Sequence, residues 1–304
     1  MTTTGAPGDS AQGGYIVPLV AATFFMGSSF VAGKTLLVDG FDPIALVGWR
    51  FVVATVATLV VALALGTRAR VLLDLRPLGA GGMLALAAIG MLQTAGVMIL
   101  LFLSMQIVSA GTAAVLLFTN PIWVALLGRL FLGERLRGGA LAGLVLGIAG
   151  TAFALGLADG ATARVPLRGA LIGLGGALCW ACSTILHKRA RLSIGAWPLT
   201  FWQMLVGSIA MLVVASARGE HWPDHTSPEQ WAWFAYLAIP ASTGSFGLWF
   251  VALARGGAVR TSSFLFLAPL FAVVLSWIVL GSALTPLQGL GALLIGTALW
   301  LVNR

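Results

Sequence analysis

Residues 109–123, SAGTAAVLLFTNPIW, and residues 257–271, GAVRTSSFLFLAPLF, follow a common pattern at a separation of 148 positions. This shift places Ala110 on Ala258 and Pro121 on Pro269. A second offset varies between 153 and 155 positions because the loops of the two halves differ in length. It aligns four further pairs: Ser29 with Ser183, Lys34 with Lys188, Pro43 with Pro198 and Trp49 with Trp202. The chain is therefore built from two similar halves.

The composition places both halves in a lipid bilayer. The 304 residues are 59% hydrophobic and 9% charged, with a mean hydropathy of +1.01, whereas about a quarter of the residues of a soluble domain are charged. A membrane-spanning helix needs about 20 apolar residues, and continuous apolar runs favour helices over a barrel. The ten predicted spans run near residues 14–37, 43–66, 78–103, 107–131, 139–157, 169–187, 198–217, 230–254, 261–280 and 286–302.

Three spans carry a local start signal. Asp42, Ser227 and Thr285 each precede a proline, and each is predicted to cap the helix that begins there.

The ten spans divide into two repeats. A tail at residues 1–13 precedes a first five-helix repeat at 14–157, and a linker at 158–168 leads to a second repeat at 169–304. Because five is odd, the second repeat is expected to cross the membrane upside down. The predicted fold class is an all-α integral membrane protein, with two inverted five-helix repeats around a central cavity. Such repeats are typical of secondary transporters that work by alternating access; a duplicated scaffold or receptor subunit without transport is the alternative.

The distribution of cations predicts the orientation. If both termini are cytoplasmic, the inner connections and the tail hold twelve Lys and Arg residues and the outer connections hold four, as the positive-inside rule requires. Residues 1–12 contain no Lys or Arg, which is atypical of a cleavable signal. We therefore expect a multi-pass protein of the bacterial inner membrane with a retained first helix.

The remaining composition excludes several classes. The formal charge is +8, but the cations are scattered between apolar runs, so no nucleic-acid surface is expected. Cys179 and Cys182 lie in one apolar stretch and are expected to be packing residues. The outer connection at residues 218–229 contains His221 and His225 but is expected to be a solvated loop, and no metal site is predicted. No motif for a membrane enzyme occurs, and no cofactor is expected.

The motifs resemble one known family. Residues 109–111 (SAG), Asn120-Pro121 and residues 132–134 (LGE) look like the EamA-type branch of the drug/metabolite transporter superfamily, as do residues 27–30 (GSSF) with Lys34, and residues 49–51 (WRF). The resemblance covers the whole chain and implies a ten-span exporter of small metabolites, with the fifth and tenth helices peripheral. One departure is that Gly281-Ser282 stands where the second repeat of such proteins usually has Gly-Glu.

Two prolines lie near the middle of predicted spans. Pro121 and Pro269 each remove a backbone hydrogen bond, and irregular backbone at that depth survives only beside protein or a wet cavity. They are therefore candidate gating or kink positions, with a purely structural kink as the alternative. The amide of Asn120 favours a position facing the cavity.

Few charged residues lie within the spans, and intramembrane ionisable groups are functional candidates. Arg50 is the first candidate for holding an anionic group, because its planar fork binds carboxylates bidentately; a structural pair with Asp39 or Asp42 is the alternative. Lys34 and Lys188, the only lysines, occupy matching places in the repeats. They could serve one gate each or reach toward the lipid headgroups.

Aromatic residues supply the other candidate contacts. Trp180 lies midway along the sixth span with Ser183 at helical spacing, which could form a wall for an apolar side chain; packing is the alternative for each aromatic. The further cavity candidates are Phe118, Trp123, Trp202 and Trp249.

These residues predict a transporter that exports amino acids or related carboxylate-bearing metabolites. No Asp or Glu lies at mid-membrane, which argues against a multidrug exporter that exchanges cations for protons. An organic-phosphate or nucleotide-sugar antiporter would need a denser cluster of cations. The expected partners are the lipid bilayer and a small solute. The glycine stripe at residues 139, 143 and 147 predicts a close helix contact within the chain or in a weak homo-oligomer.

Overall fold

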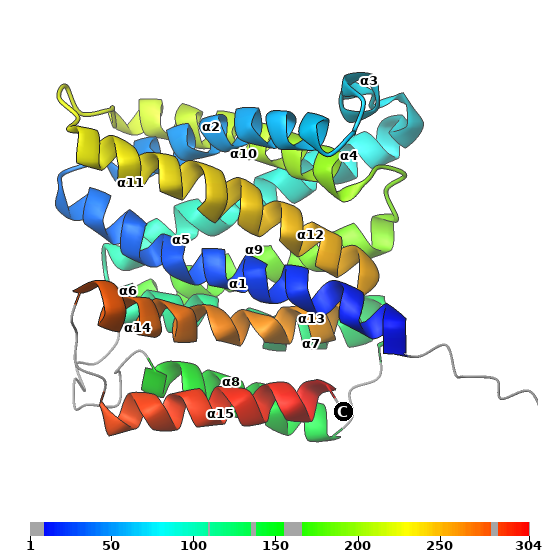
Figure 1. Ribbon diagram of the computed structural model, residues 1–304, viewed down its shortest axis with the longest axis vertical. Coiled ribbons are helices and arrows are strands. Elements are labelled where there is room, and N and C mark those ends of the chain that lie inside the picture. The colour runs from blue at the N-terminus through cyan, green and yellow to red at the C-terminus, as the bar shows by residue number, and fades with distance from the viewer. Residues whose placement is uncertain (1–8, 109, 135–137, 155–165, 281–284, 304) are drawn as a thin grey trace, which may run out of the picture.

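The computed structural model describes residues 9–108, 110–134, 138–154, 166–280 and 285–303, and every regular element in these ranges is a helix. Six of the predicted spans are single helices that lie alongside one another (Figure 1). They are α1 (Asp9–Val38), α2 (Pro43–Ala64), α8 (Gly138–Ala154), α9 (Leu167–Ala190), α10 (Ala196–Arg218) and α15 (Pro286–Asn303).

The other four spans are interrupted helices. The third comprises α4 (Gly79–Ile89), η2 (Gly90–Gly96) and α5 (Val97–Met105), and the eighth comprises α11 (Pro228–Ala238), η3 (Ile239–Gly244) and α12 (Ser245–Arg255). The fourth comprises α6 (Ala110–Leu117) and α7 (Asn120–Phe131), and the ninth comprises α13 (Ala258–Ser263), η4 (Phe264–Phe266) and α14 (Leu267–Leu280). The interruptions thus occur in matching spans of the two repeats. The short helices α3 (Ala69–Leu73) and η1 (Arg76–Leu78) connect the second span to the third.

These helices confirm the predicted fold class of ten helices in two inverted repeats. Seven helical segments are long and apolar enough to cross a membrane, and three shorter apolar helices accompany them within the described residues. The start of α1 and the C-terminal end of α15 lie at the same end of the bundle (Figure 1). We call this end, which also holds the connection from α9 to α10, the α9–α10 end; the opposite end is the α1–α2 end.

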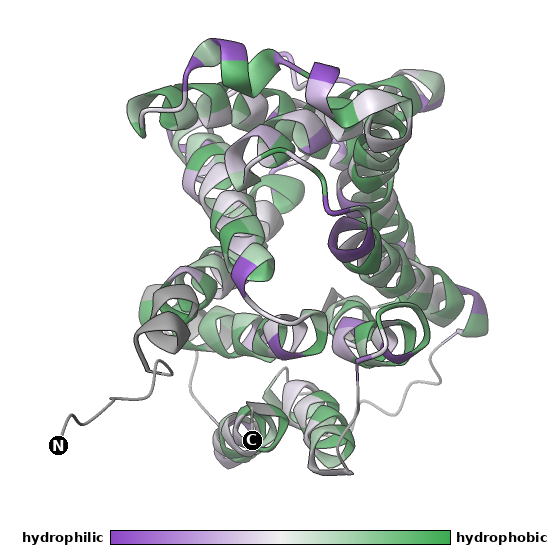
Figure 2. Cartoon of the chain, turned by 90° about the vertical axis from the view of Figure 1, so that its right-hand side faces the viewer, coloured by the Kyte–Doolittle hydropathy of each residue, from purple (hydrophilic) through white to green (hydrophobic). Residues whose placement is uncertain are grey.

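The fifth and tenth helices, α8 and α15, form a pair at the edge of the bundle. Figure 2, viewed along the helices, shows this pair set apart from the other eight spans. Small residues allow the two backbones to approach closely: a Cβ atom at Gly150 would lie 2.9 Å from the carbonyl oxygen of Gly291, and one at Gly143 would lie 2.8 Å from that of Ala298. Gly147 packs against the ring of Phe266 on η4. The peripheral position is therefore confirmed, and Gly143 and Gly147 make contacts within the chain.

Both predicted proline interruptions are present. α6 ends at Leu117 and α7 begins at Asn120, directly before Pro121. In the ninth span, the 3-10 turn η4 precedes Pro269. The prolines therefore follow irregular backbone, as expected from the hydrogen bond that each removes.

Two further interruptions were not predicted. η2 and η3 are π-helical, a rare geometry that occurs mostly as single turns inside α-helices, frequently at functional sites. Pro240 lies within η3 and Gly90 begins η2. Neither residue by itself specifies a π-helix, so the segments could not be found from the sequence pattern.

Two of the three predicted helix caps are confirmed, and one is wrong. Ser227 and Thr285 each form a reciprocal capping box, with Gln230 and Gln288 respectively. Asp42 makes no side-chain cap to α2.

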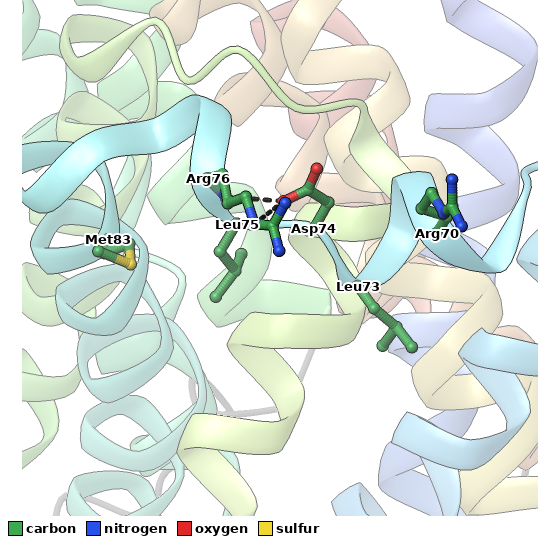
Figure 3. Close-up of a pocket in the computed structure, with 6 residues that line it drawn as sticks. All are labelled: Arg70, Leu73, Asp74, Leu75, Arg76 and Met83. Atoms are coloured by element: carbon green, nitrogen blue, oxygen red, sulfur yellow. Dashed lines mark hydrogen bonds and ion pairs between the residues drawn. The ribbon is translucent and has the colours of Figure 1, made fainter.

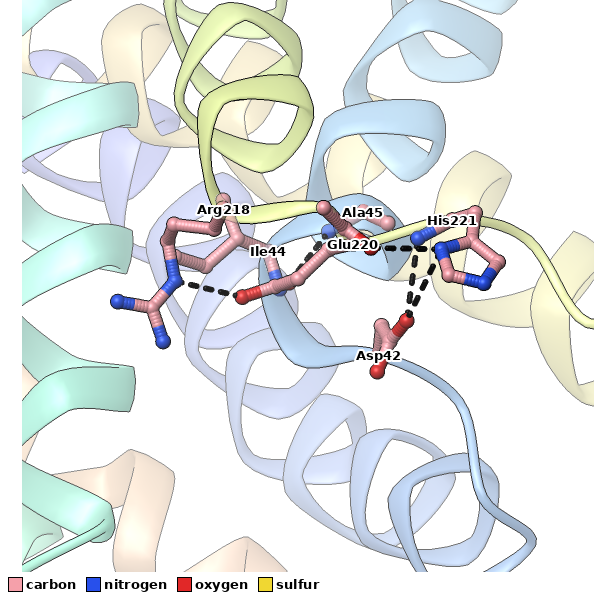
Figure 4. Close-up of polar contacts among 7 residues, drawn as sticks. Asp42, Ile44, Ala45, Arg218, Glu220 and His221 are labelled. Atoms are coloured by element: carbon pink, nitrogen blue, oxygen red, sulfur yellow. Dashed lines mark hydrogen bonds and ion pairs between the residues drawn. The ribbon is translucent and has the colours of Figure 1, made fainter.

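The start of α2 is capped instead by Glu220, from the connection after α10. Its Oε2 accepts hydrogen bonds from the backbone N–H groups of Ile44 at 2.6 Å and Ala45 at 3.2 Å (Figure 4). The Asp42 carboxylate accepts from the backbone N–H of His221 at 3.0 Å. A carboxylate distant in sequence has thus replaced the local one at the positive end of the helix dipole.

The contact between α8 and α15 can be tested with two alanines on α15. Gly291→Ala is expected to lower the Tm of the purified protein, because its Cβ would lie 2.7 Å from the carbonyl oxygen of Gly150 and overpacking costs about 1–3 kcal/mol. Gly296→Ala, which meets no atom within 4 Å, is the matched control and should leave the Tm unchanged or higher. Equal Tm values for the two variants would contradict this account of the helix pair.

Candidate functional site

The interior of the bundle contains buried polar atoms without a protein partner. A buried donor or acceptor that lacks a hydrogen bond costs about 1–3 kcal/mol, so such atoms mark places where water or a polar solute would bind. Among the described side chains, nine buried atoms lack a hydrogen-bond partner: Gln93 Oε1, Asn120 Oδ1, Trp180 Nε1, Ser183 Oγ, His187 Nδ1, Gln203 Nε2, Trp249 Nε1, Thr261 Oγ1 and Ser262 Oγ.

Two of the predicted tryptophans, both in the second repeat, are in contact with each other. Trp180 on α9 and Trp249 on α12 form an edge contact, with ring centroids 6.0 Å apart. Both rings are buried, and neither indole N–H has an acceptor. Ser183, almost one turn further along α9, is fully buried with an unpartnered hydroxyl. The structure therefore brings three of the predicted site residues to one place.

Asn120 connects the broken fourth span to α9. Its Nδ2 donates to the backbone carbonyl oxygen of Ala177 at 3.2 Å, while Oδ1 is buried without a donor. Ala177 lies three residues before Trp180 on the same helix. The unused acceptor of Asn120 is thus held against α9, almost one turn before Trp180, by a hydrogen bond that fixes the amide.

Arg50 on α2 is buried, with 7% of its surface exposed. Its Nε donates to Ser242 Oγ at 2.6 Å, and Nη2 reaches the carbonyl oxygen of Ala241 at 3.5 Å. Ser242 and Ala241 belong to η3, so this guanidinium joins the first repeat to the π-helical segment of the second.

The alternative ion pair of Arg50 with Asp39 or Asp42 is not formed. Asp39 accepts a hydrogen bond from Gln230 Nε2 at 3.1 Å, and Asp42 accepts from the backbone of His221. Across the described part of the chain, no carboxylate lies within ion-pair distance of Arg50. The buried charge is therefore hydrogen-bonded only to neutral groups.

Other predicted cavity residues have protein partners. The indole N–H of Trp123 donates to Thr119 Oγ1 in the same span, and that of Trp202 donates to the carbonyl oxygen of Leu72. Phe118 is buried against Phe30. These contacts favour packing for the three side chains, whose role in binding stays a prediction.

The predicted gating cation Lys188 ties α9 to the turn between α12 and α13. Its Nζ donates to the carbonyl oxygen of Gly256. Lys34, its counterpart, lies in α1, but its side chain is outside the described part of the structure.

The glutamate of the first Gly-Glu motif caps a helix of the other repeat. Glu134 Oε1 accepts from the backbone N–H of Ala258 at 3.0 Å, and Oε2 accepts from that of Val259 at 3.3 Å. These residues begin α13 at the α9–α10 end. Gly281-Ser282, which replaces the second motif, lies outside the described residues.

A separate surface pocket of about 770 Å³ lies at α3 and the start of the third span (Figure 3). Arg76 and Asp74 face each other there at 4.0 Å, and the Arg76 side chain is 95% exposed. The pocket is lined by one continuous stretch of chain and contains none of the predicted site residues: its lining is Arg70, Leu73, Asp74, Leu75, Arg76 and Met83.

Sequence analysis missed Gln93, Thr94, Gln203 and Ser242. All four are buried polar residues on η2, α10 or η3. A polar residue within an apolar span was their available signal, but serine and threonine also bond within their own helix. The hydrogen bonds of Thr94, Gln203 and Ser242 across the repeats became visible only in the fold.

A comparison with protein families shows which family the chain belongs to. The description "EamA-like transporter family" matches residues 14–156 and again residues 167–304. The chain belongs to the EamA-like transporter family. Its duplicated match agrees with the repeat offsets in the sequence, and the family is one of transporters.

Several relatives of this transporter carry printed names. It is 28% identical to an uncharacterized transporter of Bacillus subtilis, YvbV, over 64% of this chain and 63% of that protein. It is 30% identical to a probable amino-acid metabolite efflux pump of Escherichia coli, over 63% of this chain and 67% of that protein. It is 28% identical to a probable terminal-alkyne amino-acid exporter of Streptantibioticus cattleyicolor, over 94% of this chain and 92% of that protein.

A solved crystal structure has the same fold. The two chains superpose with a TM-score of 0.79 at 19% sequence identity, and the match covers 97% of each. This likeness supports the arrangement of the helices and carries no information on the substrate.

The helix caps at the two ends of the transporter can be tested separately. Glu134→Ala is expected to raise the amide hydrogen exchange of Ala258 and Val259 about fivefold, because an N-terminal cap contributes about 1 kcal/mol. Glu220→Ala is the matched variant and should raise exchange at Ile44 and Ala45 only. A similar rise in hydrogen exchange at both helix starts in either variant would show that each carboxylate stabilises more than the helix that it caps.

Proposed function

We propose that this EamA-like transporter exports amino acids or related small carboxylate-bearing solutes by alternating access. The observation that carries the proposal is the buried Arg50 guanidinium, which is hydrogen-bonded to a serine hydroxyl and approached by a backbone carbonyl oxygen. Burying a charge is costly unless it is paired. A carboxylate would supply the missing negative charge and accept two parallel hydrogen bonds from the guanidinium.

The indole pair supplies a second contact for such a solute. Trp180 and Trp249 offer apolar ring surface together with two unpartnered N–H donors. Asn120 Oδ1, whose amide is hydrogen-bonded to Ala177 almost one turn before Trp180, is an acceptor for an ammonium group. Donors, an acceptor and apolar surface together suit the functional groups of an amino acid.

The buried charged residues argue against two other functions found in the superfamily, multidrug export and organic-phosphate exchange. Arg50 is the one charged residue among the buried side chains that the structure describes. Exchange of cationic drugs for protons needs a buried carboxylate, and binding of organic phosphates would call for several cations. The names of the relatives from Escherichia coli and Streptantibioticus cattleyicolor, which refer to amino acids, also favour amino-acid export.

The orientation and location form part of the same proposal. The start of α1 and the end of α15 lie at the α9–α10 end (Figure 1), and the sequence places twelve of the seventeen Lys and Arg residues in the connections and tail of that end. By the positive-inside rule, this end faces the cytoplasm of a bacterial cell. The functional division is into repeats at residues 14–157 and 169–304, which rock around a site between them.

Transport by reconstituted protein tests the role of Arg50. Liposomes are screened with labelled standard amino acids, and Arg50→Gln is expected to raise the KM for the transported amino acid at least tenfold, because a hydrogen bond to a charged group contributes about 1.5–3 kcal/mol. Arg50→Lys should give an intermediate KM, because it keeps the charge without the fork. Arg168→Gln, at an exposed position, is the charge-matched control.

Two results would contradict the proposal. The first is that wild-type protein transports only cationic dyes and no amino acid. The second is that Arg50→Gln and Arg168→Gln transport amino acids with the same KM.

The indole N–H of Trp180 can be tested independently. Trp180→Phe keeps an aromatic ring but removes the buried donor, so we expect a several-fold rise in KM with little change in Tm. Trp123→Phe is the matched control, since its N–H already donates to Thr119 within the same span. An unchanged KM in Trp180→Phe would restrict this side chain to packing.

A further inference from the structure

The two π-helical segments lie at matching places in the repeats, and each is bound by the opposite repeat. The 148-residue offset places Thr94 of η2 on Ser242 of η3, and the 153-residue offset places Arg50 of α2 on Gln203 of α10. Arg50 Nε donates to Ser242 Oγ, and Thr94 Oγ1 donates to Gln203 Oε1. The internal symmetry therefore maps one hydrogen bond between the repeats onto the other.

The two hydrogen bonds lie toward opposite ends of the bundle. Arg50 and Gln203 each follow the first residue of their helix by seven positions, and α2 begins at the α1–α2 end while α10 begins at the α9–α10 end. The two helices pack antiparallel, with Gly48 against Leu212 and Thr58 Oγ1 3.6 Å from Met204 Sδ. Arg50 thus ties α2 to η3 toward one end of this helix pair, and Gln203 ties α10 to η2 toward the other. Thr243 of η3 makes a further hydrogen bond to the carbonyl oxygen of Ala54 on α2. We call the two ties the Arg50 clamp and the Gln203 clamp.

The clamps differ in charge. Ser242 donates its own proton to the carbonyl oxygen of Leu237 at 2.8 Å, so it meets the guanidinium of Arg50 only as an acceptor. In the Gln203 clamp both partners are neutral. A carboxylate competes strongly with a hydroxyl for a guanidinium, because it carries a full negative charge and accepts two parallel hydrogen bonds from the planar fork. The same carboxylate gains much less at an amide.

We propose that the substrate carboxylate releases the Arg50 clamp and leaves the Gln203 clamp closed. This inference rests on the proposed carboxylate-bearing substrate. Binding draws Arg50 away from Ser242, so that η3 stays joined to α2 through Thr243, which donates to the carbonyl oxygen of Ala54 and accepts from Thr58. The contact of α11 and α12 with α2 is thereby weakened at the α1–α2 end. Gln203 is a positioning residue, which holds η2 against α10 at the other end whether or not substrate is bound. The substrate thus acts on one end of a symmetric framework because only one of the matched residues is charged.

The experiment measures amide hydrogen exchange of residues 90–96 and 239–244 in the full-length protein in lipid nanodiscs. Arg50→Met and Gln203→Met are matched variants that remove one clamp each and keep an apolar side chain of similar length. Arg50→Met is expected to raise exchange about tenfold in residues 239–244 only, and Gln203→Met about fivefold in residues 90–96 only. These two measurements need no substrate.

The substrate arm uses the best transported of the standard amino acids and the amine that corresponds to it without the carboxylate. In wild-type protein the amino acid should raise exchange in residues 239–244 about tenfold, leave residues 90–96 unchanged, and have no effect on residues 239–244 of Arg50→Met. The amine should change neither segment. Transport of an amino acid without a change in residues 239–244, or with equal changes in both segments, would overturn the inference. Failure to transport any amino acid would instead overturn the proposed function, while the two variants still report on the clamps.

Discussion

The structure depends on one constraint, which is that hydrocarbon offers no hydrogen bonds to a polypeptide backbone. Six of the ten spans meet it as uninterrupted helices. The four interrupted spans are the third, fourth, eighth and ninth, and their irregular segments pack against other helices: Thr243 of η3 donates to the carbonyl oxygen of Ala54 at 2.8 Å, and Asn120 donates to that of Ala177. Both of these hydrogen bonds join one repeat to the other.

The same constraint explains why a single buried cation dominates the electrostatics of the site. A guanidinium in a low-dielectric interior is strongly destabilised unless an anion approaches, and the described neighbours of Arg50 are a hydroxyl, a carbonyl oxygen and the face of Phe51 at 5.1 Å. These contacts hold the side chain in place without neutralising it. The unpartnered indole and amide atoms of the interior have the same property, because they are positioned by packing yet keep their hydrogen-bonding capacity.

Duplication supplied two similar halves, and divergence made them unequal. Arg50 and Gln203 occupy matching positions, as do Glu134 and Ser282, and in each pair one member carries a charge that the other lacks. The backbone of both repeats keeps the same irregularities: a π-helical segment in the third and eighth spans and a break before proline in the fourth and ninth. A symmetric framework therefore carries different chemistry at its two ends.

The sequence by itself determined the ten spans, the duplication, the inverted topology and the proline interruptions. Hydropathy and the missing N–H of proline act on the segment that contains them, and an odd number of spans per repeat gives the second repeat the opposite orientation. It also predicted that Arg50, Asn120 and Trp180 would be buried in functional positions, but not their partners. The tertiary structure alone decided that Arg50 binds Ser242 rather than Asp39 or Asp42, that Glu220 rather than Asp42 caps α2, and that Glu134 caps α13. In each case the partner lies more than a hundred residues away in the chain, and only the packing of one repeat against the other brings the two groups within hydrogen-bond distance.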